Sequence, residues 1–139
     1  MKAPLGVGLV GLLMVLSFHS VGGSAQTPFR DTGSALFMAY CASCHGRDAH
    51  GDGPVAESLK TRPPNLTQLA KLNGGMFPAE RTRRVIDGRE AGVRAHGTIE
   101  MPVWGDAFIR REGLTDAAAR ARIDAIVSYL EAIQERVAH

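Results

Sequence analysis

The sequence is poor in cysteine and in net charge, and it lacks the patterns of β-proteins and repeat proteins. Its two cysteines allow at most one disulfide bond, which excludes a small domain built on several disulfides. Sixteen Lys and Arg against 14 Asp and Glu leave a net charge of +2, a near balance that argues against nucleic acid as a partner. The 139 residues show no strand-like alternation, no internal repeat and no low-complexity tract. These absences leave one small all-α domain.

Long apolar runs are also missing, apart from one near the N-terminus. Lys2 precedes an unbroken run of apolar residues and glycine over residues 5–16, and small residues follow up to Ala25. This pattern is typical of a secretory signal peptide, and the run is shorter than the ~20 residues that span a bilayer. We therefore expect residues 1–25 to be a signal peptide, with an uncleaved anchor as the alternative. Residues 26–139 would form one soluble domain that works in the periplasm or otherwise outside the cytoplasm.

The helix-like segments are short, and loops rich in glycine and proline separate them. Between residues 46 and 78, nine of 33 residues are Gly or Pro, and residues 88–105 are again loop-like. The longest apolar stripe follows Thr115, which caps a helix expected from Asp116 to about Val137. Shorter helices are expected at residues 34–41, around 66–72, and at 79–87.

The centre of such a domain needs a filler other than side chains, because short helices with long loops bury little apolar surface. A large flat apolar cofactor would fill it. Cys41, Cys44 and His45 form a C-x-x-C-H string, the pattern of covalent haem c attachment. Each thiol adds to one vinyl group of the same porphyrin, and His45 then provides a ligand to the iron. A single motif predicts one haem c, bound through two thioethers.

The two cysteines have three other interpretations. A structural zinc site needs four ligands, so it would have to recruit His50 and a further group. A thioredoxin-like redox pair needs a βαβ unit, which the pattern does not contain. A plain disulfide would leave the centre of the domain unfilled. Only haem c accounts for the motif, the export signal and the loops together.

The second axial ligand of the iron is expected to be Met101. Pro102 follows it and restricts residue 101 to an extended conformation, which stiffens the loop and lowers the entropic cost of ligation. Met76 follows two flexible glycines and is more naturally a packing residue beside Phe77. The remaining candidates are Met38, His50, His96 and an open coordination position.

The sequence from residue 26 onward resembles the class I c-type cytochromes, small soluble carriers of one haem. Several motifs occur in the family's order: Gly33 and Phe37 ahead of CASCHG, GDGP from Gly51, PPNL from Pro63, AERTRRVIDG, HGTIEMPVWG, and Ile126, Tyr129 and Leu130 in the last helix. The resemblance implies the cytochrome c fold, in which the first and last helices cross and Gly33 and Phe37 meet the last three of these residues. It also implies that Pro64 offers its carbonyl to His45 and that Met101 binds the iron.

Further residues near the motifs have two interpretations each. Trp104 either donates its indole N–H to a haem propionate or packs against the macrocycle. His96 is a propionate partner, a redox-linked proton site, an alternative ligand or an ordinary loop histidine. A basic group either neutralises propionates and docks an acidic partner or forms a solvated helix face. It consists of Arg81, Arg83, Arg84, Arg89 and Arg94.

These features favour an electron carrier over an enzyme. Iron held by His45 and Met101 has no vacant position for substrate, and thioether ligation favours the ferrous state. The partners would be redox proteins, donors and acceptors, that dock transiently on a monomer. One alternative is the haem subunit of a periplasmic dehydrogenase or oxidase. Another is a peroxidase-like enzyme with an open distal site, in which His96 and Arg94 would form the distal pair.

Overall fold

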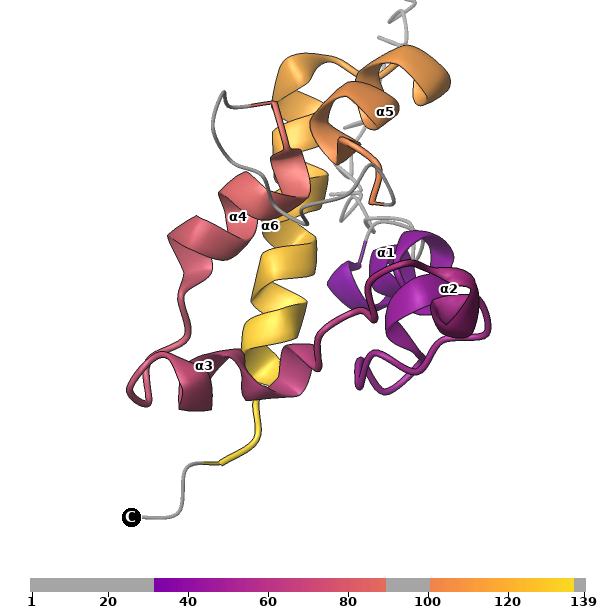
Figure 1. Ribbon diagram of the computed structural model, residues 1–139. Helices are drawn as coiled ribbons and strands as arrows, with labels where there is room; N and C mark the ends of the chain where they lie inside the picture. Colours follow the sequence, from indigo (N-terminus) through magenta and orange to yellow (C-terminus); the bar gives the residue numbers. More distant parts are fainter. Residues whose placement is uncertain (1–31, 90–100, 137–139) are drawn as a thin grey trace, which may run out of the picture.

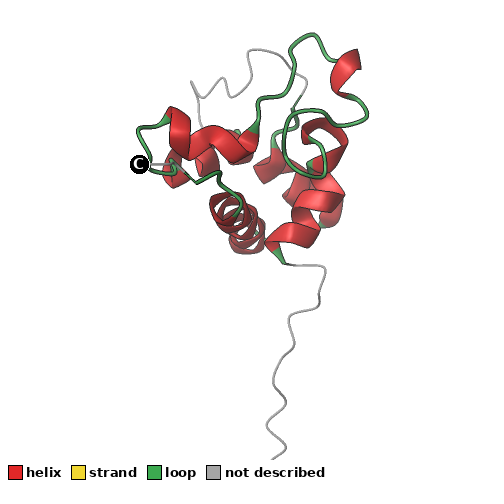
Figure 2. Cartoon of the chain, turned by 90° about the horizontal axis from the view of Figure 1, so that it is seen from below, coloured by secondary structure: helices red, strands yellow, loops and turns green. Residues whose placement is uncertain are grey.

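The computed structural model describes residues 32–89 and 101–136, and within these two ranges it is helical without strands (Figures 1 and 2). The all-α prediction is therefore confirmed. Six α-helices and two short 3₁₀ helices follow one another along these ranges. Their bounds are α1 Gly33–Tyr40, α2 Ala42–His45, η2 Ala56–Ser58, η3 Leu66–Gln68, α3 Leu69–Leu72, α4 Ala79–Asp87, α5 Trp104–Glu112 and α6 Asp116–Ala132.

The longest helix, α6, is the centre of the fold, and α1, α4 and α5 all pack against it (Figure 1). Its apolar stripe supplies Ile123 and Ile126, which are 0% and 1% exposed. Phe37 from α1, Phe108 from α5 and Ile86 from α4 complete the core around that stripe. Burial of such a side chain stabilises the folded state by about 1.5–3 kcal/mol. Most of this stabilisation depends on α6, because the core side chains of the other helices pack against it.

The first and last helices meet at a glycine, as the cytochrome resemblance implies. A Cβ atom on Gly33 would lie 2.0 Å from the carbonyl oxygen of Ala125 and 2.8 Å from Cβ of Tyr129, so only glycine allows this approach. One turn later, the rings of Phe37 and Tyr129 pack with their centroids 5.3 Å apart. The predicted crossing of these two helices is confirmed.

Both ends of α6 are set by side chains. Thr115 caps the start, because its hydroxyl accepts a hydrogen bond from the backbone N–H of Ala118. The helix ends at Ala132, whereas the sequence predicted about Val137. Gln134 and Glu135 leave the helix to bind the η3–α3 segment instead: Gln134 Nε2 donates to the carbonyl of Leu66 at 2.8 Å. The extended prediction is wrong at this end because those contacts lie 68 residues away in sequence.

The helix at 79–87 is confirmed as α4, and it ends at Gly88, which has the left-handed φ of +68°. Helix α5 is an element that the sequence pattern did not predict. Its N-cap, Val103, has no capping side chain, and its first residue, Trp104, lay in a segment with the pattern of a loop. The helix is stabilised by packing, since Phe108 is fully buried against α6.

No helix among the described residues is long and apolar enough to cross a membrane. The expected signal peptide, residues 1–25, lies outside the described residues.

Candidate haem-binding site

The three motif residues stand on one helical turn. Cys41 is both the C-cap of α1 and the N-cap of α2, and Cys44 and His45 follow within α2. Residues three and four apart share a face of a helix, so the two thiols and the imidazole lie on the same side of this turn. The backbone N–H of His45 donates to the carbonyl of Cys41 at 2.9 Å, which closes the turn.

The glycine-rich loop after the motif folds back over the end of α2. The carbonyl of His45 accepts a hydrogen bond from Gly51 at 2.8 Å, and that of Cys44 accepts one from Gly53 at 3.1 Å. These bonds satisfy carbonyls that a helix end leaves without intrahelical partners. Gly51 has a φ of +80°, and a Cβ atom there would lie 2.1 Å from the carbonyl oxygen of Pro63. The backbone of His45 is therefore held through Gly51 to the proline pair.

The environment of the thiols fits a thioether-linked cofactor. Cys41 and Cys44 are both free cysteines. Burial, and then the neighbouring Cys44, raise the pKa of the Cys41 thiol to about 12. A buried site that disfavours charge on sulfur suits the neutral sulfur of a thioether. His45 is 7% exposed on the same turn, so the donor set is that of haem c.

A zinc site lacks its ligands in the described part of the chain. No group of three or more His, Cys, Asp and Glu side chains converges there. His50, the residue that such a site would recruit, is exposed.

Pro64 lies beside the loop that holds His45. A Cβ atom on Gly51 would be 3.1 Å from the carbonyl oxygen of Pro64, so this carbonyl is close to the loop backbone. The adjoining Leu66 donates its N–H to Ala49 at 2.8 Å and ties the two segments together. The role of Pro64 as acceptor for the imidazole of His45 stays a prediction.

The segment of the expected distal ligand reaches the attachment motif through aromatic contacts. Met101 is half-buried and packs against the core. Three residues later, Trp104 meets Tyr40 edge-on with ring centroids 5.3 Å apart, and Tyr40 directly precedes Cys41. Trp104 and Phe108 pack at 5.5 Å. The structure therefore brings the Met101 segment to the start of the attachment turn, while iron ligation by Met101 and a propionate bond from Trp104 stay predictions.

The competing ligand candidates have other positions. Met76 lies in the turn between α3 and α4 and is 73% exposed, so the packing role expected beside Phe77 is wrong; Phe77 alone packs against the core. Met38 is 38% exposed on α1. His96 and Arg94 lie outside the described residues.

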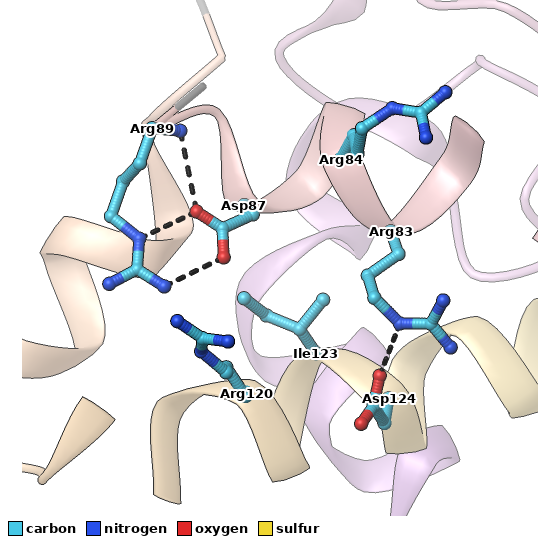
Figure 3. A pocket seen from close by; sticks show the side chains of 7 residues that line it. All are labelled: Arg83, Arg84, Asp87, Arg89, Arg120, Ile123 and Asp124. Carbon is cyan, nitrogen blue, oxygen red and sulfur yellow. Dashed lines mark hydrogen bonds and ion pairs between the residues drawn. The ribbon is translucent and has the colours of Figure 1, made fainter. Parts of the chain in front are cut away.

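The expected basic group is largely paired with acids. Arg83 binds Asp124 through Nε at 2.5 Å and also binds Glu80, and Arg84 lies 3.7 Å from Glu80. Arg89 pairs with two carboxylates, those of Asp87 and Asp116. With Arg120, the arginines line a groove of about 590 Å³ between α4 and α6 (Figure 3). Because carboxylates balance them, these residues do not form a free cationic surface.

Sequence reasoning missed Tyr40 and Asp87 as residues of the site. Tyr40 forms part of the aromatic bridge to Trp104, and its position before the motif was the available signal. Burial, and then a hydrogen bond with Glu112, raise the pKa of Tyr40. Asp87 and Arg89 flank the glycine that ends α4, so a short-range ion pair could have been expected from their spacing.

Comparison with known proteins agrees with this geometry. A solved structure that matches the chain was not found. The sequence model of the family described as cytochrome c oxidase, cbb3-type, subunit III matches residues 29–130, which include the attachment turn, Met101 and most of α6. A match that covers more than half of the chain shows that the chain is a member of this family. The chain belongs to the cbb3-type subunit III family of c-type cytochrome domains.

Proposed function

We propose that the protein is an exported one-electron carrier with a single haem c, attached through Cys41 and Cys44 and ligated by His45 and Met101. Membership of a cytochrome c family supports haem c and electron transfer in general. When bound, haem iron supplies one-electron chemistry between its ferrous and ferric states. The residues of this chain would hold the axial ligands in place, exclude water from the iron and set its midpoint potential.

The observation that carries the proposal is the fixed attachment turn. His45 is buried, and the carbonyls at the end of α2 are bound by the N–H groups of Gly51 and Gly53. A ligand on such a rigid turn keeps its position when the iron changes charge. Low reorganisation favours rapid electron exchange and does not require a substrate pocket.

The contacts of the distal segment support ligation by Met101. The ring of Trp104 against Tyr40 brings this segment to the start of α2, whereas Met76 is exposed on the turn after α3. A closed site with two protein ligands disfavours binding of small molecules, as an electron carrier requires.

A second candidate function is that of the haem subunit of a terminal oxidase. The description of the matched family, a subunit of a cbb3-type cytochrome c oxidase, favours it. The same site would then transfer electrons within a stable complex instead of during transient encounters. Fractionation of cells that make the protein separates the two: a carrier is recovered as a free monomer in the soluble exported fraction, and a subunit is recovered from the membrane fraction with its partner chains.

The ligand assignment is tested with Met101→Ala and a matched control, Met76→Ala, in the haem-bound protein. Met101→Ala should abolish the weak far-red charge-transfer band of methionine-bound ferric iron and permit carbon monoxide to bind the reduced protein rapidly. It should also lower the midpoint potential by a sizeable part of the roughly 0.8 V range that axial ligands control. Met76→Ala should leave all three properties unchanged.

The reverse pattern, in which Met76→Ala opens the iron, would contradict the assignment. Rapid binding of carbon monoxide by the unmodified protein would instead support the peroxidase-like alternative.

A further inference from the structure

Arg89 stands at the junction of three helices and uses its guanidinium on two of them. Its Nε and Nη2 atoms donate to the two carboxylate oxygens of Asp87, the last residue of α4, at 2.6 and 2.8 Å (Figure 3). Its Nη1 atom donates to Asp116, the first residue of α6. A bidentate pair of this kind has a defined geometry as well as a favourable charge interaction. We name the three residues Asp87, Arg89 and Asp116 the arginine clamp.

The clamp lies directly on the start of α5. A Cβ atom on Gly105 would lie 2.3 Å from Nε of Arg89 and 2.5 Å from Oδ1 of Asp87, so the pair rests on the bare backbone of this glycine. Next to it, Gly88 approaches Val103: a Cβ atom on Gly88 would lie 3.3 Å from Cα of Val103. The end of α4 therefore contacts residues 103 and 105 at two points, two and four residues after Met101.

The other side of the same segment is held by aromatic rings. Trp104, between the two clamped positions, packs on Tyr40 and Phe108. Residues 103–105 are thus fixed between the end of α4 and the end of α1. Because Pro102 restricts the backbone before them, Met101 has little freedom to move independently of this anchored segment.

The guanidinium of Arg89 is directed toward the two carboxylates of the clamp rather than toward a ligand. Arg89 is 25% exposed and Asp87 is 22% exposed at their side chains, and each of the three guanidinium nitrogens of Arg89 donates to a carboxylate. Four arginines and two carboxylates, Asp87 and Asp124, line the groove beside it. Each of these arginines has a carboxylate partner, because Glu80 and Asp116, outside the lining, also pair with them. An external anion would have to displace these partners, so a role in positioning explains the arrangement better.

We propose that Arg89 is a positioning residue for the distal ligand: the arginine clamp holds the start of α5 and thereby keeps Met101 at the iron. This inference rests on the proposed function, in which Met101 is that ligand. Without the clamp, the fraction of molecules with Met101 dissociated should increase, although the attachment turn and the core are untouched.

Binding of imidazole to the ferric haem-bound protein measures that fraction. Imidazole binds only where Met101 has left the iron, so its apparent affinity is the intrinsic affinity scaled by the dissociated fraction. Arg89→Gln should tighten apparent imidazole binding about fivefold to tenfold, the effect of losing a partly exposed charge-assisted interaction. The far-red band should weaken in parallel. Arg110→Gln is the matched control, because Arg110 pairs with Asp106 within α5 on an exposed face.

Two further variants separate geometry from charge and stability. Arg89→Lys keeps the charge but loses the bidentate contact, so it should tighten imidazole binding nearly as much as Arg89→Gln. Asp116→Asn weakens the contact of Arg89 to α6, together with the 2.8 Å ion pair between Asp116 and Arg120, and leaves the bidentate pair with Asp87 in place; it should give about a twofold to threefold effect in a protein that still folds. If Arg89 only stabilised the fold, Arg89→Gln would lower the unfolding temperature without changing imidazole binding. That result would overturn the proposal.

Met101→Ala distinguishes this inference from the function on which it rests. If wild-type protein resists imidazole, Met101→Ala binds it tightly and Arg89→Gln behaves as wild type, the clamp is refuted and the ligand assignment stands. If wild-type protein and Met101→Ala bind imidazole equally well, the ligand assignment itself fails.

Discussion

Replacing Gly33 with alanine tests the helix crossing on which the domain is built. The added Cβ atom would lie 2.0 Å from the carbonyl oxygen of Ala125 and 2.8 Å from its carbonyl carbon. Both atoms belong to the backbone of α6, so rotation of a side chain cannot relieve the overlap. The helices must move apart, and the ring contact of Phe37 with Tyr129 one turn later must loosen with them.

The magnitude follows from two opposing effects. Overpacking in a well-packed contact costs about 1–3 kcal/mol. Alanine gains at most about 1 kcal/mol over glycine in a helix, and less here because Gly33 is the first residue of α1. We therefore expect Gly33→Ala to lower the free energy of unfolding by about 1–2 kcal/mol. For a domain of this size each kcal/mol lowers the unfolding temperature by about 4–8 °C.

The measurement is denaturant unfolding of the haem-bound protein, with Ser34→Ala as the matched control on the same helix. Ser34 is exposed, and its hydroxyl contacts only the Thr32 hydroxyl at 3.3 Å, so this variant should lie within about 0.5 kcal/mol of wild type. Equal unfolding midpoints for Gly33→Ala and Ser34→Ala would show that the two helices do not cross in close contact at this residue.

Two further predictions concern the residues that follow α6 and the loss of stability at low pH. Gln134→Ala removes the hydrogen bonds to Leu66 and Ala70, both 2.8 Å, and should cost about 1–3 kcal/mol and speed hydrogen exchange of the Ala70 amide. Gln134→Glu still accepts from Ala70 but sets a carboxylate oxygen against the carbonyls of Leu66 and Leu130, so it should destabilise the protein while speeding exchange of the Ala70 amide less than Gln134→Ala does. Equal exchange rates in all three proteins would contradict this. The hydrogen bond from Arg89 holds the pKa of Asp87 below its usual value. A lowered folded-state pKa stabilises above the unfolded value near 4, and this stabilisation is lost as pH falls through the folded pKa. The difference in unfolding temperature between wild type and Arg89→Gln should therefore shrink between pH 6 and pH 2, and a constant difference would assign it to packing instead of to the ion pair.

The sequence predicted best what depends on neighbouring residues. The cap at Thr115 and the helix at 79–87 both occur as predicted, and the residues that bound these helices, Thr115 and Gly88, lie next to them in the sequence. The apolar residues of α6 repeat at helical spacing, so its buried face could be predicted without knowing which helices pack against it. The C-x-x-C-H motif is five consecutive residues, so haem c could be predicted from spacing alone, and its covalent attachment stays a prediction.

The incorrect and missing predictions share a different cause. Helix α5 begins without a capping side chain and is stabilised by burial of Phe108 against a helix that comes later in the chain. Met76 is apolar and was expected to pack, yet it lies on an exposed turn. In both cases the outcome depends on which surfaces meet, and local pattern carries no information on that.

By itself, the sequence determined the helical class, the C-x-x-C-H motif of Cys41, Cys44 and His45, and the pairing of the first and last helices, because each depends on short-range spacing or on a known order of motifs. Only the tertiary structure decided that α6 ends at Ala132 and that Arg89 joins Asp87 to Asp116, 27 residues away. Contacts between distant segments are set by how the helices pack as a whole. The arginine clamp exists only once α4, α5 and α6 have met.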